Sequence, residues 1–309
     1  MHHTFYKSWG RFSLMLLLAG LGLAVPAHAQ TNLLDQLETQ EVKPTTTEFV
    51  DATFKSTRLI SGHTVQTPGQ GTMVFLISHR FGTLNSGAYN FFGLDQATLR
   101  LGFEYGFTDR LTLGIGRSSL EKTFDGFLKY KAIRQSTGLH SFPVSVTLFT
   151  SSALNTLRYS DNLDRTLPRR MAYTYQALIA RKFSPALSLQ FMPTLVHSNL
   201  VANKQDHNDV YALGFGGRQK LTKRTSLNAE YYYLMPNSKP TGVRNALALG
   251  FDLETGGHVF QLHVTNSQGM IEKFFVANTQ GNFFKGDLYF GFNVNRNFTV
   301  RPKGQFRNK

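Results

Sequence analysis

The chain has 309 residues, no cysteine, and 33 Lys and Arg against 19 Asp and Glu, which gives a formal charge of +14. The absence of cysteine excludes disulfides, thiolate metal sites, c-type haem attachment and lipid attachment through an N-terminal cysteine. This length fits one large domain or two small ones, and the basic excess favours polyanionic partners.

The first 29 residues have the pattern of a secretory signal peptide. Lys7 and Arg11 form a basic n-region, residues 13–25 are apolar, and Ala27-His28-Ala29 is a small-x-small cleavage site. The apolar stretch is too short to span a bilayer, and a buried N-terminal helix is the alternative. Removal of the signal leaves 33 − 2 = 31 basic and 19 acidic residues, or +12. We therefore expect an exported protein that meets no nucleic acid.

Residues 30–66 differ from the rest of the chain. They open with an amphipathic helix candidate at Leu33 to Leu37, continue through a Pro-Thr linker, and end in turn residues. This pattern favours a periplasmic extension that tucks into one end of the domain formed by residues 67–298.

Residues 99–116, LRLGFEYGFTDRLTLGIG, alternate in polarity with a period of two. Leu101 and Phe103 share one parity, whereas Gly102 and Glu104 share the other. Period two predicts β-strands. Strands of about nine to eleven residues are long enough to cross a membrane when tilted. The pattern recurs in twelve segments, at residues 72–81, 99–107, 111–116, 125–133, 142–150, 172–183, 186–197, 210–219, 226–234, 245–253, 258–266 and 287–298.

The connections between these segments alternate in length. Residues 108–110, 184–185, 221–225 and 254–257 are tight turns, residues 135–141 form a somewhat longer break, and most of the other connections are long loops. Short turns at one end and long loops at the other are typical of an outer-membrane barrel, with the termini and the turns in the periplasm. A soluble sandwich has no reason to sort its loops in this way.

The two faces of the strands indicate which one meets lipid. The polar face is rich in Gly, Ala, Ser and Thr, which suit a narrow and strongly curved lumen. We therefore expect the apolar face to meet lipid. A closed sheet also satisfies every backbone group, as a bilayer demands.

Three stretches carry a family resemblance. SHRFG (78–82), GLDQATLRLGFEYGFTDRLTLGIGRS (93–118) and GDLYFGFNVNRNF (286–298) are similar to a family of uncharacterised predicted outer-membrane β-barrel proteins of Gram-negative bacteria. The resemblance covers residues 46–298 and implies a barrel in the outer membrane, without an established activity or catalytic residues. Such barrels often end on an aromatic residue that the barrel assembly machinery reads, but here Phe298 is followed by a basic tail, residues 299–309.

Catalytic patterns are weak in this chain. Ser78 and His79 are adjacent on a strand and point to opposite faces, so they cannot act as nucleophile and base. His263 has lumen parity beside polar residues and is expected to join a polar network. His197 and His207 flank a loop with too few neighbouring ligands for a metal. We expect no enzyme activity, no cofactor and no metal, with an outer-membrane hydrolase as the third alternative.

The inward charges are the better functional lead. They are Arg100, Glu104, Asp125, Lys129, Lys131, Arg218 and Glu230. Such charges can select ions or small anions in a channel, with Lys129 and Lys131 as the basic constriction. Equally, they can form a structural salt-bridge network in a plugged barrel, with the two lysines paired to Glu104 and Asp125.

The sequence therefore predicts an all-β, transmembrane, antiparallel up-and-down barrel of about 12 strands. The expected function is passage or binding of small solutes, with anions favoured by the lumen charges and by the loop residues Arg158, Arg165, Arg169 and Arg170. The alternative is a closed structural or assembly barrel that partners periplasmic proteins. Outer-membrane lipid and lipopolysaccharide are the expected surroundings.

Overall fold

The computed structural model describes residues 46–159 and 166–301. The signal peptide, the helix candidate at 33–37, Arg165 and most of the basic tail lie outside these ranges. No helix among the described residues is long and apolar enough to cross a bilayer.

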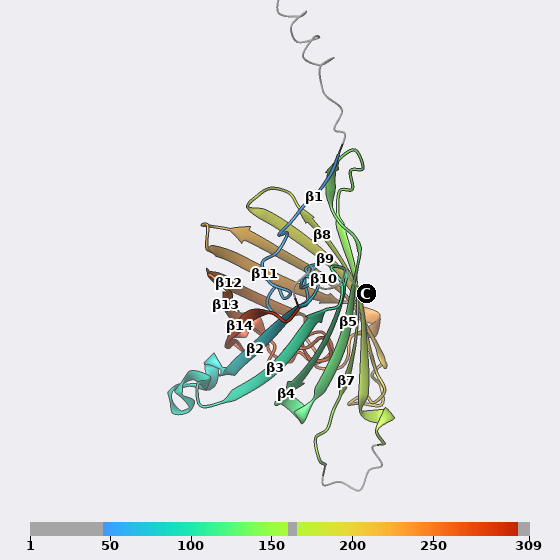
Figure 1. Cartoon of the computed structure of the whole chain (residues 1–309). Coiled ribbons are helices and arrows are strands. Elements are labelled where there is room, and N and C mark those ends of the chain that lie inside the picture. The colour runs from blue at the N-terminus through green and yellow to red at the C-terminus, as the bar shows by residue number, and fades with distance from the viewer. Residues whose placement is uncertain (1–45, 160–165, 302–309) are drawn as a thin grey trace, which may run out of the picture. The chain divides into compact units, whose positions relative to one another are not determined.

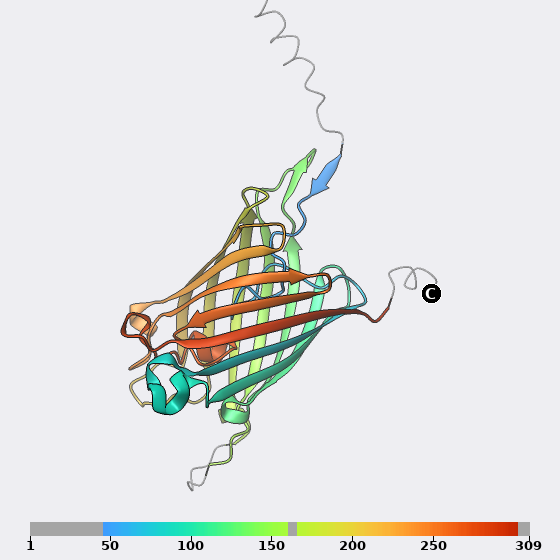
Figure 2. The ribbon, with the colours of Figure 1, turned by 90° about the vertical axis from the view of Figure 1, so that its left-hand side faces the viewer.

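Twelve antiparallel strands close into one barrel, which confirms the predicted fold class (Figures 1 and 2). The barrel order is β10-β11-β12-β13-β14-β2-β3-β4-β5-β7-β8-β9, so β14 pairs with β2 to close the sheet. The strands are β2 (Thr72–Thr83), β3 (Ala97–Gly106), β4 (Leu111–Ser118), β5 (Phe124–Ile133), β7 (Ser145–Leu154), β8 (Met171–Lys182), β9 (Leu187–Ser198), β10 (Asp209–Lys220), β11 (Thr225–Leu234), β12 (Ala246–Thr255), β13 (His258–Thr265) and β14 (Tyr289–Thr299).

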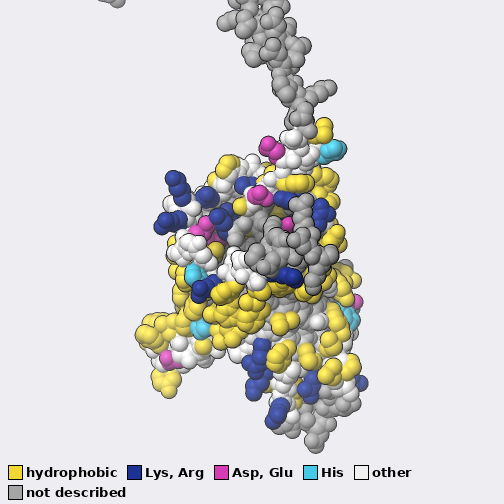
Figure 3. Space-filling view, in the orientation of Figure 1, with side chains coloured by type: hydrophobic (Ala, Val, Ile, Leu, Met, Phe, Trp, Pro, Cys, Tyr) yellow, Lys and Arg dark blue, Asp and Glu magenta, His cyan; other side chains and the backbone are white. Residues whose placement is uncertain are grey.

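Burial alternates along each strand as the sequence pattern predicts. In β3, for example, Leu101 is 41% exposed and Phe103 is 44% exposed, whereas Arg100 and Glu104 are each 1% exposed. Most large apolar side chains thus form the outside of the barrel. The inside is lined by small and polar side chains and by an apolar cluster that includes Phe127, Phe149 and Met192 of the wall. Figure 3 shows hydrophobic side chains gathered over the wall, with Lys and Arg mainly above and below them.

The segment between β5 and β7 differs from the prediction. The sequence pattern places a strand at 142–150, but β7 begins at Ser145 because Pro143 cannot donate a backbone hydrogen bond. The preceding residues form β6 (Ser136–Gly138), which pairs with β1 (Thr47–Phe49) in a separate two-stranded ribbon. This ribbon projects from the barrel in Figure 2.

The connections are sorted by length between the two ends of the barrel. We call the end with the β3–β4, β8–β9, β10–β11 and β12–β13 turns the turn end, and the opposite one the loop end. The loop end also carries short 3-10 helices, η1 (Leu84–Ser86), η2 (Ala88–Gly93), η3 (Leu120–Lys122), η4 (Pro168–Arg170), η5 (Pro236–Ser238) and η6 (Phe283–Lys285). The assignment of the turn end to the periplasm remains a prediction.

Two segments lie inside the barrel rather than outside it. Residues 53–66, which we call the plug, contain Phe54, Leu59 and Val65, all at most 3% exposed. The β13–β14 connection, which was expected to be an outer loop, folds inward and carries α2 (Glu272–Phe275), whose Phe275 packs against Tyr232 with ring centroids 5.0 Å apart. Together with Leu178 and Met192 of the wall, these residues form the main apolar cluster.

Candidate functional site

The plug is held mainly by side chains of the wall that bind its backbone. Glu230 on β11 accepts backbone N–H groups from three successive plug residues, Ile60, Ser61 and Gly62, at 2.8–3.3 Å. Gly62 is needed here because a Cβ at this position would lie 2.2 Å from the Tyr232 hydroxyl. A carboxylate that accepts several N–H bonds in a buried site fixes the chain strongly.

Other wall strands repeat this arrangement around the lumen. Gln190 on β9 accepts from the Val65 N–H at 2.9 Å and donates to the His63 carbonyl at 2.8 Å. Further contacts come from β2 (Arg80 to the Ser61 hydroxyl), β5 (Lys129 to the Gln66 carbonyl), β7 (Thr147 to the Val65 carbonyl), β13 (Gln261 to the Leu59 carbonyl) and β14 (Asn293 to the Ile60 carbonyl). The plug is therefore tied to wall strands on all sides of the lumen.

A charged cluster joins the plug, the inward β13–β14 connection and the wall. Arg58 of the plug lies 3.8 Å from Glu104 on β3 and 3.8 Å from Glu272 on α2, and His63 lies 3.9 Å from Glu272. Burial raises the pKa of Glu272, against the opposing effect of Arg58. Burial, assisted by Arg58 and Lys129, lowers the pKa of His63 well below its usual value. The cluster thus couples both lumen segments to one wall strand.

The charged residues named by the sequence analysis all lie on the inward parity of their strands. Lys131 is half-buried near the turn end. The other six are at most 8% exposed, namely Arg100, Glu104, Asp125, Lys129, Arg218 and Glu230. Arg100 forms a bidentate pair with Asp125 at 2.5 and 2.9 Å. Arg218 donates to Ser226 at 3.0 Å and contacts Glu254 at 3.3 Å. The Lys129 ammonium donates to the Gln66 carbonyl at 2.6 Å, so it contacts the plug.

Sequence reasoning missed part of this network. Arg80, Gln261 and Asn293 carry the inward parity, so the alternation alone could have added them. By contrast, Glu272 and His63 lie in segments without periodicity, and no local pattern places them against Arg58. Their role follows only from the folding of both segments into the lumen.

The loop end of the barrel holds a cup with a volume of about 470 Å³. It is lined by Phe274 and Gln268 of the inward connection and by Arg169, Arg170 and Tyr159, among others. Of the described residues, the charged ones that line it are three cations, Arg169, Arg170 and Lys273, and two acids, Glu121 and Asp206. Glu121 is engaged by Lys273 and by Asn155, each at 2.8 Å. A cup of this volume fits a small molecule.

The histidines are arranged as follows. His79 points to the outside and stacks on Phe292 at 4.9 Å, whereas Ser78 is buried on the inside. His263 is buried in the lumen, and His197 contacts Asp209 at 2.6 Å. Across residues 46–159 and 166–301, no group of three or more His, Asp or Glu side chains is placed to hold a metal ion.

The chain is similar to several solved structures. The NanC porin is similar in fold, with a TM-score of 0.44, 8% sequence identity, and coverage of 72% of this chain and 97% of the porin. The COG4313 outer membrane channel from Pseudomonas putida F1 has a TM-score of 0.43, 14% identity, and coverage of 75% and 97%. The outer membrane protein Omp33 of Acinetobacter baumannii has a TM-score of 0.40, 10% identity, and coverage of 74% and 97%. No curated protein matches the chain in sequence.

The family comparison covers most of the chain. The family described as "Membrane bound beta barrel domain (DUF5777)" matches residues 54–298, which include all but the first residue of the plug and every barrel strand except the last residue of β14. The apolar exterior of the sheet fits a membrane-bound state. Closure of the sheet also pairs the backbone groups of the strands with one another, as is required in a bilayer core that offers them no hydrogen-bond partner. The chain therefore belongs to this family of membrane-bound β-barrels.

Proposed function

We propose that the protein is a gated outer-membrane barrel, in which the loop-end cup binds small anionic solutes and the plug controls their passage. The observation that carries this proposal is the plug itself, which is tied across the lumen to β2, β5, β7, β9, β11, β13 and β14. Passage through this lumen requires movement of the plug.

The anion preference rests on the charges of the cup. Arg169, Arg170 and Lys273 line the cup. Lys273 pairs with Glu121 at 2.8 Å, so these two charges offset one another, and Arg169 and Arg170 against Asp206 leave an excess of one positive charge. Cationic groups at a pore mouth favour anions.

Binding to the cup can be measured by isothermal titration of the purified full chain with inorganic phosphate and with succinate. We expect binding that weakens in the double variant Arg169→Gln and Arg170→Gln. The matched control is Arg181→Gln, on the outer face of β8 close to the turn end. Equal binding by the cup variant and the control would contradict the assignment of the cup.

A second candidate function is the docking of a periplasmic protein on the β1–β6 ribbon. Phe49, Leu139 and Phe142 are 41–59% exposed on or beside this ribbon. Exposed apolar groups on a short strand pair suit the addition of a further strand. Loss of a co-purifying periplasmic protein on Phe49→Ser substitution, with solute binding unchanged, would favour this candidate.

A further inference from the structure

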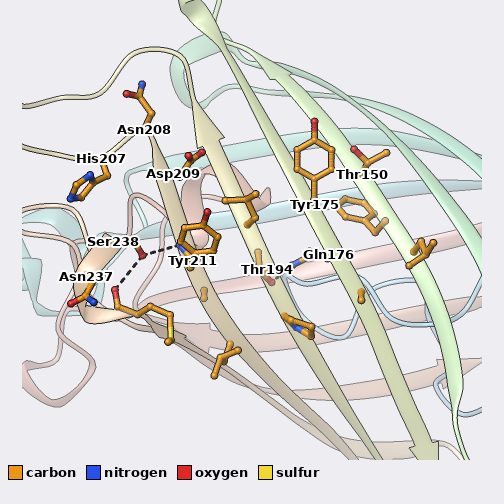
Figure 4. A pocket seen from close by; sticks show the side chains of 18 of the residues that line it. Thr150, Tyr175, Gln176, Thr194, His207, Asn208, Asp209, Tyr211, Asn237 and Ser238 are labelled. Carbon is orange, nitrogen blue, oxygen red and sulfur yellow. Dashed lines mark hydrogen bonds between the residues drawn. The ribbon is translucent and has the colours of Figure 1, made fainter.

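A large hollow lies on the outer face of the barrel wall. It has a volume of about 1440 Å³ and extends over β5, β7, β8, β9 and β10. Leu148, Tyr175 and Tyr211 point outward around it and are about half exposed. Figure 4 shows Tyr175 and Tyr211 on either side of β9, which runs between their strands. We call this hollow the outer groove.

The floor of the outer groove is made of small or backbone-limited residues. Thr150, Ala177 and Pro193 lie there, between the larger side chains. The pairing of β8 with β9 stops after Gln176↔Thr194 and resumes at Ile179↔Phe191, on both sides of Pro193. Proline has no N–H to donate, so the ladder is interrupted at the floor of the groove. The hollow is thus encoded in the sequence of the wall.

The two ends of the outer groove differ in polarity. At the loop end it is rimmed by His207, Asn208, Asp209 and Asn237, and the Tyr211 N–H donates to the Ser238 hydroxyl at 2.9 Å (Figure 4). Toward the turn end it is lined by Leu128 and Tyr130 of β5. An apolar body with one polar rim matches an amphiphile that lies along the wall.

We propose that the outer groove binds one lipid of the leaflet at the loop end, with an acyl chain over Ala177 and Pro193 and its headgroup at the rim of residues 207–209. The wall faces the membrane, so acyl chains reach the groove without passing through water. Each buried CH₂ contributes about 0.8 kcal/mol to burial of the chain.

A second copy of the chain fits this surface poorly. The commonest pairing of identical subunits is twofold and brings the same patch of each copy together. Two concave patches that face one another leave a void between them, whereas a flexible acyl chain adapts to the hollow. The shape of the outer groove therefore favours lipid over a twin barrel.

The test uses the full chain purified in detergent and native mass spectrometry of the lipid that it retains. Ala177→Trp fills the floor, and Leu249→Trp, an outward residue of β12 away from the groove, is the matched control. Displacement of about two CH₂ groups corresponds to about a tenfold loss of bound lipid. We expect this loss in Ala177→Trp, with the control retaining lipid as the unmodified chain does. Thr150→Phe fills the floor from β7 and replaces Ala177→Trp if that variant does not fold.

Two results would overturn the proposal. One is equal lipid retention by the folded floor variants and the Leu249→Trp control. The other is a disulfide-linked dimer of Thr150→Cys formed in native membranes, because the chain has no other cysteine and such a link would place a second copy in the groove.

Discussion

The barrel wall and the plug face each other across the lumen, yet their backbone hydrogen bonds are satisfied in different ways. In the wall, each strand satisfies its backbone by pairing with its neighbours, and the side chains decide only which face is apolar. In the plug, wall side chains such as Glu230 and Gln190 satisfy much of the backbone. The wall is therefore stable as a closed sheet, whereas the plug is held by a limited number of separable contacts.

The largest effect is expected in the wall. Phe191→Arg places a cation on the outer face of β9, near the middle of the strand, where Phe191 is 36% exposed, and an Arg near the bilayer midplane costs about 2–4 kcal/mol. Phe183→Arg, in the β8–β9 turn of the same hairpin, is the control and should cost about 0–1 kcal/mol. Urea unfolding in lipid vesicles measures both. Similar losses at the two positions would show that Phe191 does not face the membrane core.

A smaller but specific effect is expected in the plug. Glu230→Ala leaves three buried N–H groups without their acceptor, and hydrogen bonds to a charged group contribute about 1.5–3 kcal/mol each. Because the substitution also removes a buried charge, relief of its desolvation cost offsets part of this loss. We expect a net loss of about 2 kcal/mol, so that the plug opens roughly thirtyfold more often while the barrel stays folded. Maleimide labelling of Ser61→Cys in the two backgrounds measures this opening. Asp95→Asn, in the β2–β3 connection, is the control, and equal labelling rates in all backgrounds would contradict the role of Glu230.

The coupling between the plug and the inward connection should depend on pH. Burial raises the folded-state pKa of Glu272, so its contribution to packing is present at low pH and is lost as pH rises through that value. We therefore expect α2 to exchange its amide hydrogens faster than in Glu272→Gln as the pH is raised above about 4.3, the ordinary glutamate pKa. Comparison of the two proteins at each pH removes the intrinsic pH dependence of exchange. A difference that shrinks as pH rises would contradict this sign.

The smallest effect is expected near the N-terminal end of the plug. Lys55, just inside the plug, pairs with Glu254 at 2.8 Å, but its side chain is 37% exposed. Exposed ion pairs contribute about 0–1 kcal/mol. Lys55→Ala should therefore change maleimide labelling of Ser61→Cys by less than about fivefold. An effect as large as that of Glu230→Ala would show that the plug is held from its end rather than along its length.

The same comparison explains what the sequence could predict. The strands follow from period two. In β3, for example, the inward Arg100 and Glu104 alternate with the outward Leu101 and Phe103. The seven inward charges follow from the same parity. The sequence also indicates that residues 30–66 tuck into one end of the barrel. It does not predict the contacts of the plug, because residues 53–66 have no period and their partners, such as Glu230, are more than 160 positions away. The inward fold of the β13–β14 connection was also missed, since length alone made it look like an outer loop.

Single-channel conductance in planar bilayers tests the central claim, that residues 53–66 close the lumen, most directly. The full chain is compared with a variant in which these residues are replaced by Gly and Ser at equal length, and heat-modifiable gel mobility confirms that both barrels are folded. We expect no steady conductance from the full chain and a steady open level from the variant. A steady conductance of the full chain equal to that of the variant would contradict the account.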